Sequence, residues 1–298
     1  ATAKADPGVV YAELRDLIDD NGWWFWAQEV TSDEIVFPIR GNDWNDGGKW
    51  RVLHTHEWTN DVDAVNSMWS HLYDGVREAN KLIDGLQESA GDPAIDISIA
   101  KLKTLRALFM YMVMDNYGDV PLITSFTNAP EFPTKATRQE VYDFLVVDMK
   151  AAIPLLPLNS NKFAVNKGMG YTLLAKLYLN AEIYTGNPAY DKAEAVCDSI
   201  IGLGIYTLDN TVTAPFSATN VNVSENIFTI LFDEFDAQGF RLHMRTLHYL
   251  NDKTFGMKVG PWNGFAILED HYESYSDGDK RKEEWFLAGQ QFDLGGSK

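Results

Sequence analysis

Apolar side chains recur every three or four residues between about residues 66 and 203. This spacing is typical of amphipathic α-helices, which bury one face and leave the other in water. The first long helix is expected to start at Asn66 or Ser67 and to stop at Gly91. Its buried face is predicted to carry Trp69, Leu72, Tyr73, Val76, Ala79, Ile83 and Leu86. A chain with this pattern has to pack several helices against one another.

The next predicted helix, residues 98 to 117, is apolar on nearly every side. Such a helix must be surrounded by other helices. Arg106 lies within it, and we expect this side chain to pair with a carboxylate or with helix carbonyls. Gly118 is predicted to end the helix, and Pro121 requires an extended exit.

Three further helices are predicted over residues 138–153, 168–184 and 188–201. Thr137 and Glu140 form a capping box for the first of them. Asn187 is expected to cap the last, with Pro188 at its first position. Residues 168–201 form a pair 34 residues long, which is the period of a tetratricopeptide unit. The predicted fold class is mostly α, with degenerate tetratricopeptide-like helical hairpins over residues 66–203, long irregular loops and a few short strands.

The composition changes outside these helices. Residues 27–64 are rich in Asp, Asn, Gly and Trp, and residues 204–298 mix loop, strand and helix patterns. The run of residues 226–232 is strand-like. We expect residues 1–298 to form a single domain, with the helical core at 66–203 and the mixed part after it.

Charge and cysteine content exclude several classes of function. The net charge of −18 argues against nucleic acid and against anionic membrane surfaces. The single cysteine, Cys197, allows no intramolecular disulfide, and its apolar neighbours Ala193 and Ile200 predict a buried position. The chain has no run of ~18 apolar residues that could span a bilayer.

The sequence carries no recognisable catalytic or cofactor motif. His54 and His56 alternate on a possible strand, but no third metal ligand stands at a suitable spacing. Asp277 and Asp279 resemble the start of a calcium loop in which Arg281 occupies a ligand position. We therefore predict no catalytic residues, no cofactor and no metal.

Five stretches follow one another in a recognisable order. They are Trp69-x-x-Leu72-Tyr73-x-x-Val76-x-x-Ala79-Asn80-x-x-Ile83-Asp84; Leu105–Phe109 with Tyr117–Leu122; Arg138-x-x-Val141-Tyr142 with Asp148 and Leu156-Pro157; Gly204-x-Tyr206-x-Leu208 with Phe216 and Ser224–Ile227; and Asn263-Gly264 with Ser274-x-x-Asp277-x-Asp279-x-Arg281. Together they resemble the SusD/RagB family of starch-utilisation-type outer-membrane glycan-binding lipoproteins.

The resemblance implies a lipid-anchored protein at the outer-membrane surface of a Bacteroidetes-type bacterium, active in polysaccharide utilisation. Such a protein binds an oligosaccharide and works with a SusC-like TonB-dependent transporter, and it is not an enzyme. Family members carry a lipoprotein signal with an anchoring cysteine, and they continue well past the Ser-Asp-Arg segment. This chain shows neither feature, so we expect it to be trimmed at both ends.

Carbohydrate binding needs flat aromatic faces for the C–H patches of a sugar ring and polar groups for its hydroxyls. Two segments offer both, and the candidate glycan-binding residues are Arg40, Asn42, Asp43, Trp44, Asn45, Asp46 and Trp50 in the first, and Trp262 and Asn263 in the second. The competing interpretation is that both are structural turns whose tryptophans pack on the helices. For the aromatic run at residues 23–26 we expect core packing.

Two other functions stay open at this stage. A scaffold of helical repeats that binds only protein would show no saturable glycan binding. An all-helical glycoside hydrolase would need two carboxylates about 5–10 Å apart across a cleft.

Overall fold

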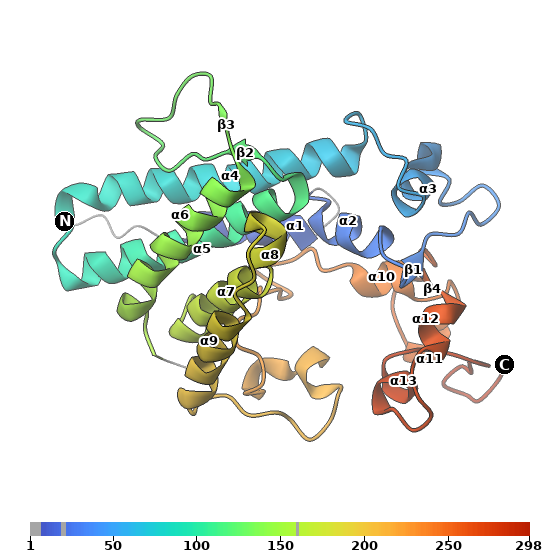
Figure 1. Ribbon diagram of the computed structural model, residues 1–298. Helices are drawn as coiled ribbons and strands as arrows, with labels where there is room; N and C mark the ends of the chain where they lie inside the picture. Colours follow the sequence, from blue (N-terminus) through green and yellow to red (C-terminus); the bar gives the residue numbers. More distant parts are fainter. Residues whose placement is uncertain (1–6, 19–21, 159–160) are drawn as a thin grey trace. The chain divides into compact units, whose positions relative to one another are not determined.

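The computed structural model describes residues 7–18, 22–158 and 161–298. Over these residues the chain is mostly helical with two short antiparallel strand pairs, which confirms the predicted fold class (Figure 1). It divides into two compact units. Unit 1 comprises residues 1–15, 69–209 and 219–231, and unit 2 comprises residues 16–68, 210–218 and 232–298. No helix among the described residues is both long and apolar enough to cross a membrane.

Helices dominate unit 1. Helix α5 packs on α6, and α7 packs on α9. Strands β2 and β3 pair antiparallel with Val120 opposite Ala136. The elements with all or most of their residues in unit 1 are α1 (Gly8–Ile18), α4 (Asp63–Leu86), η2 (Gln87–Ser89), α5 (Pro93–Tyr117), β2 (Val120–Pro121), β3 (Lys135–Ala136), α6 (Arg138–Ala152), η3 (Ile153–Leu155), α7 (Lys167–Leu179), α8 (Ala181–Thr185), α9 (Tyr190–Gly202) and η5 (Asn220–Asn222).

Local capping interactions set the starts of these helices. The Asp92 side chain accepts a hydrogen bond from the backbone N–H of Ala94, and Pro93 is the first residue of α5. Both hydrogen bonds of the predicted capping box between Thr137 and Glu140 are present at the start of α6. Each cap satisfies backbone N–H groups that have no partner inside the helix.

The approach of α4 to α5 depends on a glycine. A Cβ atom added to Gly75 would lie 2.3 Å from the ring of Phe109, which is fully buried. Only the absence of a side chain lets the ring of α5 reach the backbone of α4. The two helices run alongside each other in Figure 1.

Arg106 forms the centre of a buried polar network, as expected. It is 4% exposed, and its Nη2 lies 2.6 Å from Oδ2 of Asp148 on α6. Its Nη1 donates to Asn80 Oδ1 on α4 at 2.8 Å and to the carbonyl of Thr124 at 2.9 Å. Lys103 adds a second cation 3.0 Å from Asp148. One guanidinium on α5 thus links two other helices and the segment that follows β2.

The elements of unit 2 are shorter. Strand β1 pairs antiparallel with β4, with Ile35 opposite Ile267. The elements are α2 (Trp24–Val30), β1 (Ile35–Val36), η1 (Asp46–Gly48), α3 (Lys49–His54), η4 (Ala214–Phe216), α10 (Leu242–Thr246), α11 (Asn251–Phe255), β4 (Ala266–Ile267), α12 (Glu269–Glu273) and α13 (Lys280–Glu284).

The structure corrects several local predictions. Helix α4 begins at Asp63, before the predicted caps Asn66 and Ser67, and α5 begins at Pro93 and not at residue 98. Helix α9 begins at Tyr190 with Ala189 at the cap position, because Asn187 is held in the preceding turn by hydrogen bonds with Thr185. Residues 226–232 form no strand, and one backbone bond from Thr229 to Lys162 holds the segment. Cys197 is exposed, although Ala193 one turn earlier in α9 is buried, so the buried face of α9 does not extend to Cys197.

Replacing Arg106 with methionine should lower the free energy of unfolding by about 3–5 kcal/mol, because Asp148 stays buried without its main partner. Urea unfolding followed by circular dichroism measures this loss. The control is Arg77→Met on α4, since Arg77 is half exposed in its pairs with Asp74 and Glu78. The control should lose no more than about 1 kcal/mol. Equal losses for the two variants would contradict a special role for Arg106.

Candidate functional site

Aromatic rings of unit 2 stack into a continuous cluster. Phe37 stacks on Trp50 with ring centroids 4.0 Å apart and contacts Phe265 at 3.9 Å. Trp26 lies 4.6 Å from Phe265, and Trp23 lies 5.1 Å from Trp50. All five rings are buried. Because β1 pairs antiparallel with β4, Phe37 directly after β1 lies opposite Phe265 directly before β4.

A buried cation, Arg245 of α10, lies over this cluster. Its side chain is 8% exposed, and the guanidinium carbon lies 4.9 Å from the centroid of Trp26 and 5.5 Å from those of Trp44 and Trp262. The electron-rich faces of indole rings attract a cation, and they do so more strongly where water is excluded. The backbone carbonyl of Arg245 also accepts hydrogen bonds from the N–H groups of residues 264 and 265.

The loop of residues 40–48 is held by bonds to a distant segment. Arg40 and Asp43 form a two-residue bridge, and Arg40 Nε donates to the carbonyl of Asn263 at 2.7 Å. Trp44 Nε1 donates to the carbonyl of Trp262 at 2.8 Å. Trp44 adopts a φ of 62°, a conformation unfavourable for a bulky side chain. The hydrogen bonds from the Trp44 indole and from the Arg40 guanidinium hold the loop and the Trp44 ring in place despite that strain.

The two acidic side chains of this loop are also oriented. Asp43 Oδ2 accepts a hydrogen bond from the Tyr249 hydroxyl at 2.7 Å, and this bond raises the pKa of Tyr249 above its ordinary value. Asp46 Oδ2 accepts from Trp50 Nε1 at 2.7 Å. Asp43 Oδ1 also accepts a hydrogen bond from the backbone N–H of Trp44 at 3.1 Å. A carboxylate oxygen can accept more than one hydrogen bond, and both residues are exposed at the surface.

A cavity of about 340 Å³ opens between these groups. Its lining combines four indole rings with two carboxylates and two cations, and the residues are Trp23, Trp26, Asp43, Trp44, Asp46, Lys49, Trp50 and Arg245. Lys49 Nζ lies 4.9 Å from the ring centroid of Trp23 and 5.2 Å from that of Trp50. We call this site the tryptophan cavity.

Four of the predicted glycan-binding residues line the tryptophan cavity, namely Asp43, Trp44, Asp46 and Trp50. The other five lie outside its lining. Arg40 and Asn263 hold the loop in place, Trp262 covers Arg245, and the exposed Asn42 and Asn45 flank the lining residues in sequence.

Sequence reasoning missed Trp23, Trp26, Lys49 and Arg245. The i, i+3 spacing of the two tryptophans could have placed both on one face. Lys49 directly precedes the candidate residue Trp50, and this position was a weak indication that it belongs to the site. Arg245 comes from a stretch without any carbohydrate-binding pattern, and only the tertiary structure brings it to the site.

The structure places His54 at the end of helix α3, so His54 and His56 do not alternate on a strand as expected. Two residues of the metal-ligand patterns that the sequence analysis set aside have other partners. His56 Nε2 lies 2.8 Å from the carbonyl oxygen of Thr31. Asp279 caps α13 and pairs with Arg281 at 2.6 Å, and these contacts lower the pKa of Asp279. The Asp279 carboxylate is therefore neutralised by a side chain of its own helix.

A protein-family model described as "Starch-binding associating with outer membrane", a SusD-like family, matches residues 27–179, just over half of the chain. The chain belongs to this SusD-like family. The match begins in α2 and includes the loop of residues 40–48 as well as the network around Arg106. The resemblance drawn from the five ordered motifs is confirmed.

Two relatives support the SusD-like assignment. The starch-binding protein SusD of Bacteroides thetaiotaomicron is 25% identical over 198 residues, which make up 66% of this chain and 34% of SusD. A SusD-like protein of Bacteroides ovatus is 26% identical over 153 residues, or 48% of this chain and 28% of that protein. The chain thus spans about a third of the length of these relatives.

Solved structures share the SusD-like fold. Surface glycan-binding protein A from Bacteroides fluxus superposes with a TM-score of 0.77 at 18% identity, over 98% of this chain and 68% of its own. Surface glycan-binding protein A from Bacteroides thetaiotaomicron, solved in complex with laminarihexaose, gives a TM-score of 0.74 at 21% identity, over 93% and 62% of the two chains. At these identities the likeness shows the fold alone.

Replacing Gly264 with alanine should destabilise this SusD-like chain by about 1–3 kcal/mol through overpacking. The added Cβ would lie 2.8 Å from Phe37, 2.9 Å from Trp44 and 3.0 Å from the carbonyl of Arg245. The matched control is Gly85→Ala in α4, where no distant atom lies within 4 Å. The control should be stabilised by about 0.5–1 kcal/mol. Thermal unfolding of both variants tests the packing, and an unchanged Gly264→Ala protein would refute it.

Proposed function

We propose that this SusD-like chain binds oligosaccharides in the tryptophan cavity and does not cleave them. The observation that carries the proposal is the joining of indole rings with oriented carboxylates and cations in one cavity of a chain from a starch-binding family. The relatives' names support the ligand class, since one is a starch-binding protein and another was solved with laminarihexaose.

The aromatic part of the cavity provides the stacking surface. Trp44 is the half-buried ring, while Trp23, Trp26 and Trp50 are at least nine-tenths buried and form the wall beneath it. A sugar ring would therefore stack on Trp44, whose plane is held by the bond to the Trp262 carbonyl. Because the ring is already held, little conformational entropy is lost on binding.

The polar part of the cavity recognises hydroxyl groups. Asp43 and Asp46 each offer a carboxylate oxygen as acceptor, and Lys49 offers a donor. Charged partners strengthen hydrogen bonds to neutral hydroxyls. The volume of about 340 Å³ falls at the lower end of the ~300–1,000 Å³ range of ligand sites, which suits a short glycan segment.

Replacing Trp44 with alanine should weaken oligosaccharide binding about tenfold, or ~1.4 kcal/mol, because the stacking surface is removed. Isothermal titration calorimetry against soluble starch fragments and laminarihexaose measures the effect. The control is Trp58→Ala, since Trp58 is 43% exposed and does not line the cavity. Equal binding by the wild type and the Trp44 variant would show that the tryptophan cavity is not the glycan-binding site. If the wild type binds no member of a wide glycan panel, the function itself fails.

The proposal includes binding without hydrolysis. Both acidic residues of the cavity already accept hydrogen bonds from neighbouring side chains, which suits a fixed binding site. Incubation of the chain with the glycans that it binds should release no new reducing ends. Hydrolysis by the wild type that is lost in an Asp43→Asn or Asp46→Asn variant would contradict binding without cleavage. It would favour the alternative function, an all-helical glycoside hydrolase.

We further propose that the full-length protein is a lipid-anchored protein of the outer-membrane surface that works with a SusC-like TonB-dependent transporter in polysaccharide utilisation. The family description, which names the outer membrane, supports this setting. Affinity purification of the native protein from outer membranes should recover a TonB-dependent transporter. Recovery of the transporter without saturable glycan binding would instead favour the scaffold of helical repeats.

A further inference from the structure

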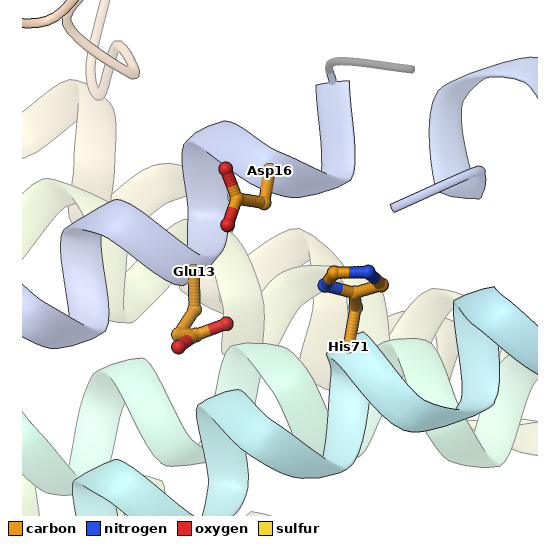
Figure 2. A group of neighbouring side chains, drawn as sticks. All are labelled: Glu13, Asp16 and His71. Atoms are coloured by element: carbon orange, nitrogen blue, oxygen red, sulfur yellow. The ribbon is translucent and has the colours of Figure 1, made fainter. Parts of the chain in front are cut away.

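We propose that Glu13, Asp16 and His71 form a binding site for a divalent transition-metal ion, with Zn²⁺ as the best-suited ion. One potential ligand atom from each of the three side chains lies within 4.8 Å of the other two. Figure 2 shows the two carboxylates of α1 and the imidazole of α4 turned toward one another. The site is independent of the tryptophan cavity and of the function proposed for it.

Helix geometry brings the two carboxylates together. Glu13 and Asp16 are three residues apart on α1, so they project from the same face of one helix. His71 lies on α4, and it belongs with Glu13 to unit 1. The position of Asp16 relative to Glu13 follows from the continuous helix α1.

The charge and burial of the group favour a cation. All three side chains are half-buried, where two neighbouring carboxylates repel each other more strongly than in water. Nδ1 of His71 is buried, and among the described residues it has no hydrogen-bond partner. A buried polar atom without a partner costs about 1–3 kcal/mol. A metal ion would accept the lone pair of a neutral imidazole beside two carboxylate oxygens that can also bind it.

The donor set selects the class of ion. One imidazole nitrogen with two carboxylate oxygens suits Zn²⁺, whereas Ca²⁺ and Mg²⁺ prefer oxygen ligands only. Bonds of ~2.0–2.1 Å place tetrahedral ligands roughly 3.4 Å apart. The three atoms, now within 4.8 Å of one another, can reach that spacing by side-chain rotation, with water as a fourth ligand.

A bound ion would link α1 to α4. Binding that is confined to the folded chain stabilises it by mass action. We therefore expect Zn²⁺ to raise the unfolding temperature of the chelator-treated, untagged chain, and titration calorimetry to give one ion per chain. Ca²⁺ and Mg²⁺ should have no comparable effect in the same concentration range.

The variants His71→Ala and Glu13→Gln should each lower the Zn²⁺ affinity on the order of 100-fold and abolish the thermal shift. Glu13→Gln keeps the shape of the side chain, so it serves as the test if His71→Ala folds poorly. The controls are His243→Ala, an exposed histidine, and Asp74→Asn, a carboxylate of α4 that pairs with Arg77. Both controls should bind Zn²⁺ like the wild type.

Three results would overturn the site. They are the absence of saturable Zn²⁺ binding by the wild type, binding that survives in both His71→Ala and Glu13→Gln, and binding that the two controls reduce as much as the site variants. None of these results bears on glycan binding, so the two proposals fail or stand separately.

Discussion

The ion pair between Arg106 and Asp148 is the interaction on which the helical unit depends. Apolar faces alone would let α5 slide or rotate against its neighbours, because burial of apolar area has no direction. A guanidinium that is 4% exposed must instead meet its partners at hydrogen-bond distance, or the cost of the buried charge is not offset. The register of α5 against α4 and α6 is thereby tied to Asn80 and Asp148.

The same network reaches beyond the helices. Arg106 also binds the carbonyl of Thr124, and Asn80 donates to the carbonyl of Ile123 at 2.8 Å. These bonds hold the chain that leaves β2, where residues without regular structure would otherwise have no partner for their carbonyls. One buried, paired guanidinium on a mostly apolar helix therefore fixes both the packing of the neighbouring helices and the course of an irregular segment.

Unit 2 has only short helices and strands, so its core and its loops are held by other interactions than those of unit 1. Its core is built from stacked aromatic rings around the Arg245 guanidinium, and its loop of residues 40–48 is fastened by side-chain bonds to backbone carbonyls. Such a loop keeps exposed polar groups in fixed positions without a helix or a sheet beneath them. This arrangement explains how a structural turn and a binding surface can be the same segment: the buried tryptophans support it, and Trp44 with the two aspartates faces the cavity.

Local signals in the sequence determined the helices and several of their ends. Periodicity predicted the mostly α fold, the Thr137–Glu140 pair predicted the start of α6, and Gly118 predicted the end of α5. A local pattern gave a wrong prediction where the same residue can form two different local structures. Asn187 could cap a helix or close a turn, and its bonds with Thr185 decided for the turn.

The sequence by itself thus determined the fold class, the family and a segment rich in tryptophan and acidic residues. Only the tertiary structure decided which of those side chains share a cavity, that Arg245 joins them, and that His71 meets Glu13 and Asp16. The physical reason is that periodicity reports which face of a helix is buried, a property of neighbours along the chain. A binding site depends on distances between residues far apart in sequence, and packing alone sets those distances.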